Sequence, residues 1–346
     1  MPFSNEPHSR RAVIVAGDRT PFVKAFGPFM TLDAVHLGVH AVRGLLQRTG
    51  LPWDQIDSIV WGGVVLPSAS PNVGREIALE LGLPHRVEAV TVSRACASGL
   101  QAITQAAAAI ERGEVDVVIA GGGDSTSNAE VQLAQKLVHA TAPVALKKNA
   151  GVRDYLRIVP QLFPLRDVMP RRPRIAERST GQLMGEAAED MGGRNHVTRE
   201  AQDELAARSH HRAAAAWEDG VFAGEVTPVH VGGQTIDRDG LVRADTNVEK
   251  LAKLRPVFSR DGTLTAGNSS ALTDGASAVL LMSEEKAREL GLQPLATLRS
   301  WAYVGVDPAD QLLMGPALAM PLALERAGLT LDEIDVVDMH EAFAAQ

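Results

Sequence analysis

The sequence contains a single cysteine, Cys96, among its 346 residues. One cysteine excludes an intrachain disulfide and a cysteine-rich zinc site, and it favours a reducing compartment. No stretch reaches the roughly 18 consecutive apolar residues that a membrane-spanning helix needs. The first residues also lack the apolar run of a secretory signal. We therefore expect a soluble, cytoplasmic protein.

Aromatic residues are scarce, and negative charges outnumber positive ones. Aromatics make up 4% of the sequence, so the core must be built from Ala, Val, Leu and Ile, and the net charge of −8 argues against nucleic acid as a partner. The exception is residues 131–178, the basic segment, where ten Lys or Arg and three Asp or Glu lie among apolar residues. We expect this segment either to dock on an anionic membrane surface or a partner subunit, or to be a solvated loop.

Strand-like and helix-like segments alternate over the first 125 residues. Runs rich in Val and Ile predict buried strands, and apolar residues at three- and four-residue spacing predict helices. This alternation is typical of a largely parallel sheet covered by helices on both faces. The predicted strands are 11–17, 56–65, 87–93 and 115–123, and the predicted helices are 31–50, 72–82 and 99–113.

Two distant segments resemble each other. "GLPWDQIDSIV" (50–60) and "GLTLDEIDVVD" (328–338) share five identical positions at an offset of 278, and each follows an amphipathic helical pattern. The shared helix–turn–strand context favours a duplicated αβ half over chance. The position equivalent to Cys96 falls near 374, so we expect the second half to be unfinished at Gln346.

Cys96 lies between a predicted strand and a predicted helix, in "VSRACASGLQAI". Free backbone N–H groups and the positive end of the helix dipole favour a negatively charged sulfur at such a position, and they can also hold an oxyanion. The small neighbours, Ala95, Ala97, Ser98 and Gly99, leave room for a substrate. A lone cysteine is also commonly a small buried apolar residue, and both interpretations are open from this position alone.

His340 is the histidine with the clearest functional context. It follows a strand-like run, "IDVVDM", and the carboxyl ends of strands are where α/β sheets present functional groups. The other nine histidines lie in no recognisable motif. We therefore expect His340 to act together with Cys96, because a thiolate nucleophile needs a partner side chain.

Five segments, taken together, resemble one family. "SRACASGLQAI" resembles the nucleophile motif of thiolases, and "AGNSSALTDGASAVLLMSE" resembles their glycine-rich coenzyme A stretch. "RTPF" (19–22), "KLRPVF" (253–258) and "MHEAFAAQ" (339–346) match in the same order. The form "HEAFAAQ" is similar to the fatty-acid-oxidation branch, the 3-ketoacyl-CoA thiolases of the β-subunit type.

The resemblance implies an α/β protein with the five-layered αβαβα fold, built from two similar halves. The N-terminal half is expected to be 1–285, with a loop domain inserted at about 124–255. Residues 286–346 would begin a C-terminal half that is truncated in this chain. The family also suggests a homodimer or tetramer, and a β-oxidation α subunit as one partner for the basic segment.

The resemblance further implies a ping-pong thiolytic reaction that converts a 3-ketoacyl-CoA into acetyl-CoA and a shortened acyl-CoA. Cys96 would carry the acyl group, and His340 would stabilise an oxyanion. Coenzyme A enters as a substrate, and the family implies no bound cofactor and no metal. The expected coenzyme A contacts are Arg243 at the nucleotide end and Met184, Phe258, Ala266 and Ser270 along the pantetheine channel. Without the family, Met184 and Phe258 would be assigned to the core, and Ala266 and Ser270 to turns.

The sequence also departs from the family pattern. The "GHP" histidine that activates the nucleophile and the "CxG" cysteine are not found within the 346 residues. The resemblance therefore predicts that this chain carries only part of the catalytic set. Two alternatives stay open, namely a biosynthetic acetyl-CoA acetyltransferase and a non-catalytic acyl-CoA-binding or assembly subunit.

Overall fold

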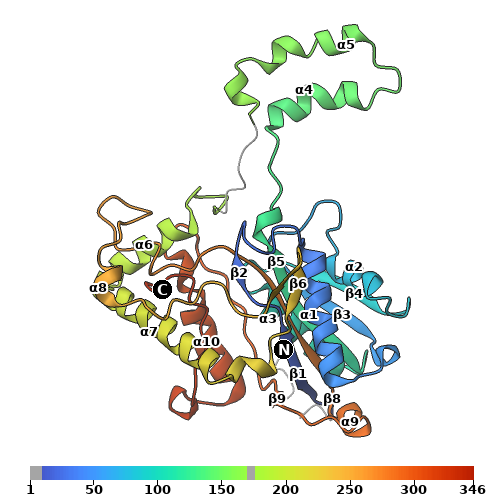
Figure 1. Cartoon of the computed structure of the whole chain (residues 1–346), viewed down its shortest axis with the longest axis vertical. Helices are drawn as coiled ribbons and strands as arrows, with labels where there is room; N and C mark the ends of the chain where they lie inside the picture. Colours follow the sequence, from blue (N-terminus) through green and yellow to red (C-terminus); the bar gives the residue numbers. More distant parts are fainter. Residues whose placement is uncertain (1–9, 170–175) are drawn as a thin grey trace. The chain divides into compact units, whose positions relative to one another are not determined.

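A computed structural model describes residues 10–169 and 176–346, which divide into two units (Figure 1). The larger unit contains residues 1–128 and 177–346, and the smaller one contains residues 129–176. The smaller unit spans fewer residues than the insertion expected at 124–255, because residues 177–255 belong to the larger unit. Among the described residues, no helix is long and apolar enough to cross a lipid bilayer.

The larger unit is built on a mixed sheet with strand order β4-β3-β5-β8-β1-β9, and β2 pairs with β8. β4, β3 and β5 run parallel, whereas β8 is antiparallel to both β5 and β1. The prediction of a largely parallel sheet is therefore confirmed for β4, β3 and β5. It is wrong for the sheet as a whole, because β8 runs antiparallel to both of its main neighbours. The strands are β1 Ala12–Arg19, β2 Val23–Lys24, β3 Ser58–Gly62, β4 Glu88–Val92, β5 Val117–Ser125, β8 Thr273–Ser283 and β9 Ala296–Thr297.

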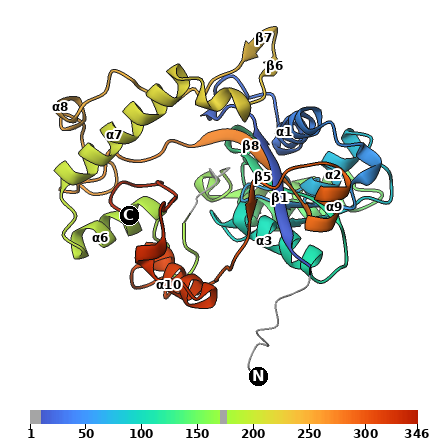
Figure 2. The ribbon, with the colours of Figure 1, turned by 90° about the horizontal axis from the view of Figure 1, so that it is seen from below.

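Helices cover both faces of this sheet. Figure 2 shows α1 and α3 on opposite sides of β1, β5 and β8. The longer helices of the unit are α1 Ala34–Thr49, α2 Val73–Glu80, α3 Ser98–Glu111, α6 Met184–Arg194, α7 Arg199–Glu218 and α10 Gly315–Ala327. The short elements are α8 Val248–Leu251, α9 Glu284–Glu289, a hairpin of β6 Val229–Val231 and β7 Gln234–Ile236, and single turns at η1 Trp53–Gln55, η2 Thr126–Asn128, η5 Val221–Gly224, η6 Leu312–Met314 and η7 Leu331–Glu333.

The alternation of side chains along β5 divides the core into two layers. Val117 and Ile119 point into the cluster under α1 and α2, whereas Val118 and Ala120 point into the cluster under α3. α3 contributes Ala-rich contacts to its layer, so its backbone lies close to the sheet. This close approach brings the start of α3 against the carboxyl ends of the strands.

The smaller unit consists of two antiparallel helical segments. Lys147 joins them through an ion pair with Asp154, at 2.8 Å. The apolar side chains of the smaller unit are largely exposed, among them Leu146 at 85% and Val152 at 75%. Residues 170–175 of the basic segment lie outside the described residues. The elements of this unit are α4 Gln135–Ala145, α5 Val152–Leu156, η3 Val159–Leu162 and η4 Leu165–Asp167.

The internal similarity is visible in local geometry. α1 and α10 both end at a left-handed glycine, Gly50 with φ 63° and Gly328 with φ 66°, and a single 3₁₀ turn follows each. After the first turn the chain enters β3, whereas residues 335–340 form no strand in the described structure. The strand predicted before His340 is therefore wrong here. A strand needs hydrogen-bonded neighbours, and this segment pairs with no strand in the described part of the chain.

Trp61 of β3 is fully buried among three glycines. A Cβ atom added to Gly38 of α1, Gly74 of α2 or Gly121 of β5 would lie 3.0, 3.1 or 2.7 Å from Trp61 atoms. The absence of side chains at these positions lets both helices and β5 pack closely against the Trp61 side chain. Gly38 also faces Ile77, which is fully buried and has no room to move aside.

We therefore predict that Gly38→Ala destabilises the protein by about 1–3 kcal/mol through overpacking. The matched control is Gly193→Ala in α6, where nothing lies within 4 Å of the added Cβ. That change should stabilise the protein by about 0.5–1 kcal/mol, as expected for alanine in an open helical position. Urea unfolding of both variants measures the difference, and equal effects would contradict this account of Trp61 packing.

Candidate active site

A cavity of about 740 Å³ contains the two residues that the sequence singled out, Cys96 and His340. The ends of β3 and β5 and the start of α3 form part of its lining. Asp124, near the end of β5, accepts hydrogen bonds from the backbone N–H groups of Val64 at 2.8 Å and Val65 at 2.6 Å. This carboxylate therefore holds the loop after β3 at the rim of the cavity.

Cys96 lies in a tight turn between β4 and α3, and its side chain is exposed. Ala95, just before it, has a left-handed φ of 45°, which costs an L-residue about 1–2 kcal/mol. Ser98 compensates, because its Oγ accepts a hydrogen bond from the Arg94 N–H at 2.8 Å and donates to the Ala95 carbonyl at 2.6 Å. The exposed sulfur is what a nucleophile requires, and it excludes the buried apolar interpretation of this cysteine.

The first turn of α3 rests on the backbone of Gly62, the last residue of β3. A Cβ atom at position 62 would lie 2.5 Å from the Ser98 carbonyl carbon and 2.7 Å from the Gly99 nitrogen. These are backbone atoms, so they cannot rotate away. The missing side chain at position 62 therefore determines how closely the Cys96 turn approaches the sheet.

Gly62→Ala should push the start of α3 off the sheet and lower the free energy of unfolding by about 1–3 kcal/mol. Gly17→Ala in β1 is the matched control, because the nearest atom to its added Cβ is Val279 Cγ1 at 3.6 Å, an ordinary contact. Chemical denaturation compares the two variants. If both unfold at the same denaturant concentration, the close contact does not constrain the Cys96 turn.

His340 is exposed and is held through the segment that follows it. Ser270 N–H donates to the Ala342 carbonyl at 2.8 Å, Ser270 Oγ donates to the Glu341 carbonyl at 3.0 Å, and Ala344 N–H donates to the Asn268 carbonyl at 2.9 Å. The glycine-rich turn before β8 thus binds the backbone of residues 341–344. This pairing carries His340 to the cavity even though no strand precedes it.

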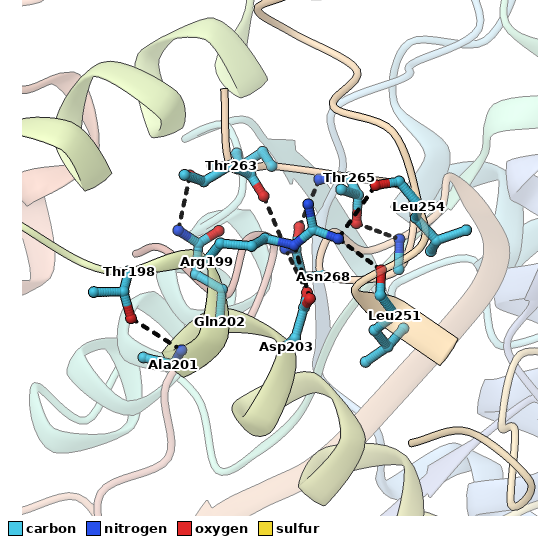
Figure 3. A network of polar contacts seen from close by, with 12 residues as sticks. Thr198, Arg199, Ala201, Gln202, Asp203, Leu251, Leu254, Thr263, Thr265 and Asn268 are labelled. Atoms are coloured by element: carbon cyan, nitrogen blue, oxygen red, sulfur yellow. Dashed lines mark hydrogen bonds and ion pairs between the residues drawn. The ribbon is translucent and has the colours of Figure 1, made fainter. Parts of the chain in front are cut away.

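A buried polar network supports that glycine-rich turn (Figure 3). Asn268 Nδ2 donates to Asp203 Oδ1 at 2.9 Å, and its Oδ1 accepts from the Thr265 N–H at 2.7 Å. Asp203 in turn pairs with Arg199 at 2.7 Å. Arg199 also donates to the Leu251 carbonyl at 2.6 Å. Asp203 and Asn268 are 1% and 3% exposed, so these charge-assisted bonds are shielded from water.

Replacing Asn268 with leucine should cost about 3 kcal/mol, because it leaves the Asp203 carboxylate and the Thr265 N–H buried with fewer partners. Asn149→Leu, at an exposed position of the smaller unit, should change stability by less than about 0.5 kcal/mol. Thermal or urea unfolding distinguishes the two variants. A similar small effect for both would mean that the network does not hold the glycine-rich turn.

The five predicted coenzyme A contacts do not line the cavity that holds Cys96 and His340. Phe258 packs edge to face against Phe343, with ring centroids 5.8 Å apart, and Met184 is the first residue of α6 and half-buried. Ser270 anchors the His340 segment as described, and the neighbouring turn residue Ala266 is exposed.

Arg243 is exposed and lies beside His210, whose Nδ1 accepts a hydrogen bond from the Arg243 backbone N–H at 3.3 Å. Burial, aided by the charges of Arg243 and His211, holds the pKa of His210 below its usual range. A lowered pKa favours the neutral ring, whose Nδ1 can accept this bond. The Arg243 guanidinium itself stays available to an anionic group.

Sequence reasoning missed the residues that position the site. Ser98 acts within its own turn, whereas Gly62, Asp124, Asp203 and Asn268 act through contacts with distant segments. Three of them lie within segments that the sequence resemblance singled out, namely Ser98, Asn268 and Asp124 of "GGGDSTS" (121–127), but no positioning role was assigned to any of them. Among the described residues, no group of three His, Cys, Asp or Glu side chains could hold a metal ion.

Comparisons with known proteins agree with this geometry. Residues 12–285 match the family model "Thiolase, N-terminal domain", and residues 292–346 match "Thiolase, C-terminal domain". The chain is 47% identical over 339 residues to a 3-ketoacyl-CoA thiolase of Aeromonas salmonicida and 45% identical to one of Shigella flexneri, covering 97% of this chain and 77% of each relative. A solved human mitochondrial 3-ketoacyl-CoA thiolase is similar with TM-score 0.83 and 31% identity, over 97% of this chain and 81% of that one. The Bacillus anthracis acetyl-CoA acetyltransferase has TM-score 0.84 and 34% identity, with the same coverage.

Proposed function

Because this chain belongs to the thiolase family, we propose that it is a 3-ketoacyl-CoA thiolase that transfers acyl groups through Cys96. Relatives that carry this name are 44–47% identical over nearly the whole chain. The observation that carries the proposal is the exposed Cys96 at the start of α3, in the same cavity as His340. A structural cysteine would need neither the exposure nor the cavity.

The reaction has two halves. The Cys96 thiol releases its proton to water, the thiolate attacks the 3-keto carbon, the bond between C2 and C3 breaks, and C2 takes a proton from water to leave as acetyl-CoA. The thiol of a second coenzyme A then attacks the acyl carbon on sulfur, which releases a shortened acyl-CoA and the free cysteine. Each half passes through an oxyanion, so the site must supply hydrogen-bond donors where that charge develops.

We assign the Cys96 backbone N–H and His340 to this stabilisation. The N–H belongs to the turn that precedes the first turn of α3, where backbone donors and the helix dipole favour negative charge. His340 lines the same cavity from the C-terminal segment. A human mitochondrial 3-ketoacyl-CoA thiolase of similar structure was solved in complex with CoA. By analogy, we propose that this chain binds coenzyme A.

The remaining coenzyme A contacts are proposals of the same kind. The exposed Arg243 suits a phosphate at the nucleotide end, because guanidinium groups bind phosphate in a bidentate manner. For the pantetheine arm we keep Met184, Phe258, Ala266 and Ser270. Ser270 and Phe258 both contact the segment that carries His340, which supports their proximity to the reacting end.

Incubation with a 3-ketoacyl-CoA should leave an acyl adduct on the Cys96 peptide, detected by mass spectrometry. Cys96→Ala should form none, because no other cysteine is present in the sequence. An adduct on another residue, or none on the wild-type protein, would contradict the acyl-transfer proposal. The second outcome would favour a non-catalytic acyl-CoA binder.

A biosynthetic acetyl-CoA acetyltransferase is the second candidate. The similarity to the Bacillus anthracis acetyl-CoA acetyltransferase favours it. The two functions differ in the length of the acyl group that they accept. Adduct formation with medium-chain 3-ketoacyl-CoA would support the degradative enzyme, and formation with acetoacetyl-CoA alone would support the biosynthetic one.

We also propose a cytoplasmic homodimer or tetramer in which the basic segment meets an α subunit of β-oxidation or an anionic membrane surface. In the smaller unit, exposed Leu146 and Val152 lie next in sequence to Lys147, Lys148 and Arg153. Apolar side chains interleaved with cations suit an anionic interface.

A further inference from the structure

We propose that Arg94 and Tyr303 form a clamp that positions the Cys96 turn for acyl transfer. Arg94 precedes the turn, and Tyr303 comes from the irregular segment between β9 and η6. The inference rests on the proposed function for its catalytic consequence, but the clamp itself is a structural claim that is tested separately. Both are positioning residues, because they act on Cys96 through the turn.

The Cys96 turn needs external support. Ala95 holds a left-handed conformation, which persists only where its surroundings fix it. Two amides close the turn, since Ala97 N–H donates to the Arg94 carbonyl at 3.0 Å and Ser98 N–H donates to the Ala95 carbonyl at 3.1 Å. The C-terminal end of the turn is held by Gly62, which lies against the start of α3. The position of Arg94 therefore determines where the N-terminal end of the turn lies.

The Arg94 side chain is held from two directions. Its Nε donates to Gln101 Oε1 at 2.7 Å, which ties it to the first turn of α3. Its guanidinium carbon lies 4.2 Å from the centre of the Tyr303 ring, within the range of a cation–π contact. The Tyr303 hydroxyl in turn hydrogen-bonds with Thr104 Oγ1 of the same helix.

This arrangement links the two family domains. Tyr303 belongs to the part of the chain that matches the C-terminal thiolase model, whereas Cys96 and α3 belong to the N-terminal part. A residue of the second domain therefore restrains the entry to the nucleophile turn of the first. Displacement of a reacting group by about 1 Å can cost about 100-fold in rate, so this restraint matters for acyl transfer.

Hydrogen exchange at the Ala97 and Ser98 amides measures the clamp directly. In Tyr303→Leu, and in Arg94→Met at its exposed position, we expect exchange to accelerate by about 10-fold, because the turn opens locally. Tyr303→Phe keeps the ring under the guanidinium and should stay within about 2-fold of wild type. The matched controls are Tyr155→Leu and Arg166→Met, which alter exposed side chains of the smaller unit and should change nothing at this turn.

Acyl transfer supplies the second measurement. The rate of adduct formation on Cys96 should fall by about 10- to 100-fold in Tyr303→Leu and Arg94→Met. In Tyr303→Phe, which keeps the ring, the rate should stay close to that of the wild type. Alkylation of Cys96 by iodoacetamide, which depends less on orientation, should stay within about 3-fold of wild type.

Unchanged amide exchange in both disruptive variants would overturn the clamp. Faster exchange with an unchanged rate of adduct formation would overturn its positioning role. If wild-type protein forms no adduct, the proposed function fails, and the exchange data still decide whether Arg94 and Tyr303 hold the turn.

Discussion

The backbone contact between Gly62 and the first turn of α3 is the constraint on which the candidate site depends. It lets the helix start directly against the end of β3, so that the preceding turn projects Cys96 into the cavity. The same turn contains Ala95 in a left-handed conformation, closed by the Ser98 hydroxyl. A strained turn persists only when its surroundings hold it in place, and here the backbone of β3 at Gly62 does so through its contact with the start of α3.

A second constraint brings His340 to the same cavity. The buried Asp203 carboxylate holds Asn268, and the turn around Asn268 holds the backbone of residues 341–344. Asp203 lies on α7, far in sequence from both Asn268 and residues 341–344. The site therefore combines two independently supported parts, one resting on the sheet and one on a polar network.

Local patterns predicted much of the fold. α1 forms within the predicted range 31–50, between the capping residues Asp33 and Gly50, and the other strands and helices of the first 125 residues form close to their predicted positions. The motifs also brought Cys96 and His340 to attention. Two predictions failed for the same reason. The antiparallel insertion of β8 and the absence of a strand before His340 depend on which strands become neighbours, and hydrophobic periodicity does not report pairing partners.

The sequence by itself determined the family and the element types and singled out Cys96 as a candidate, because motifs and residue spacing are local properties of the chain. Only the tertiary structure decided which residues support the site. Gly62 matters because the backbone of α3 passes within contact distance, and Asn268 matters because a buried carboxylate 65 residues away needs a partner. Tyr303 matters because it lies under Arg94. These are contacts between segments far apart in the chain, and their effects come from close packing and exclusion of water, which exist only once the chain has folded.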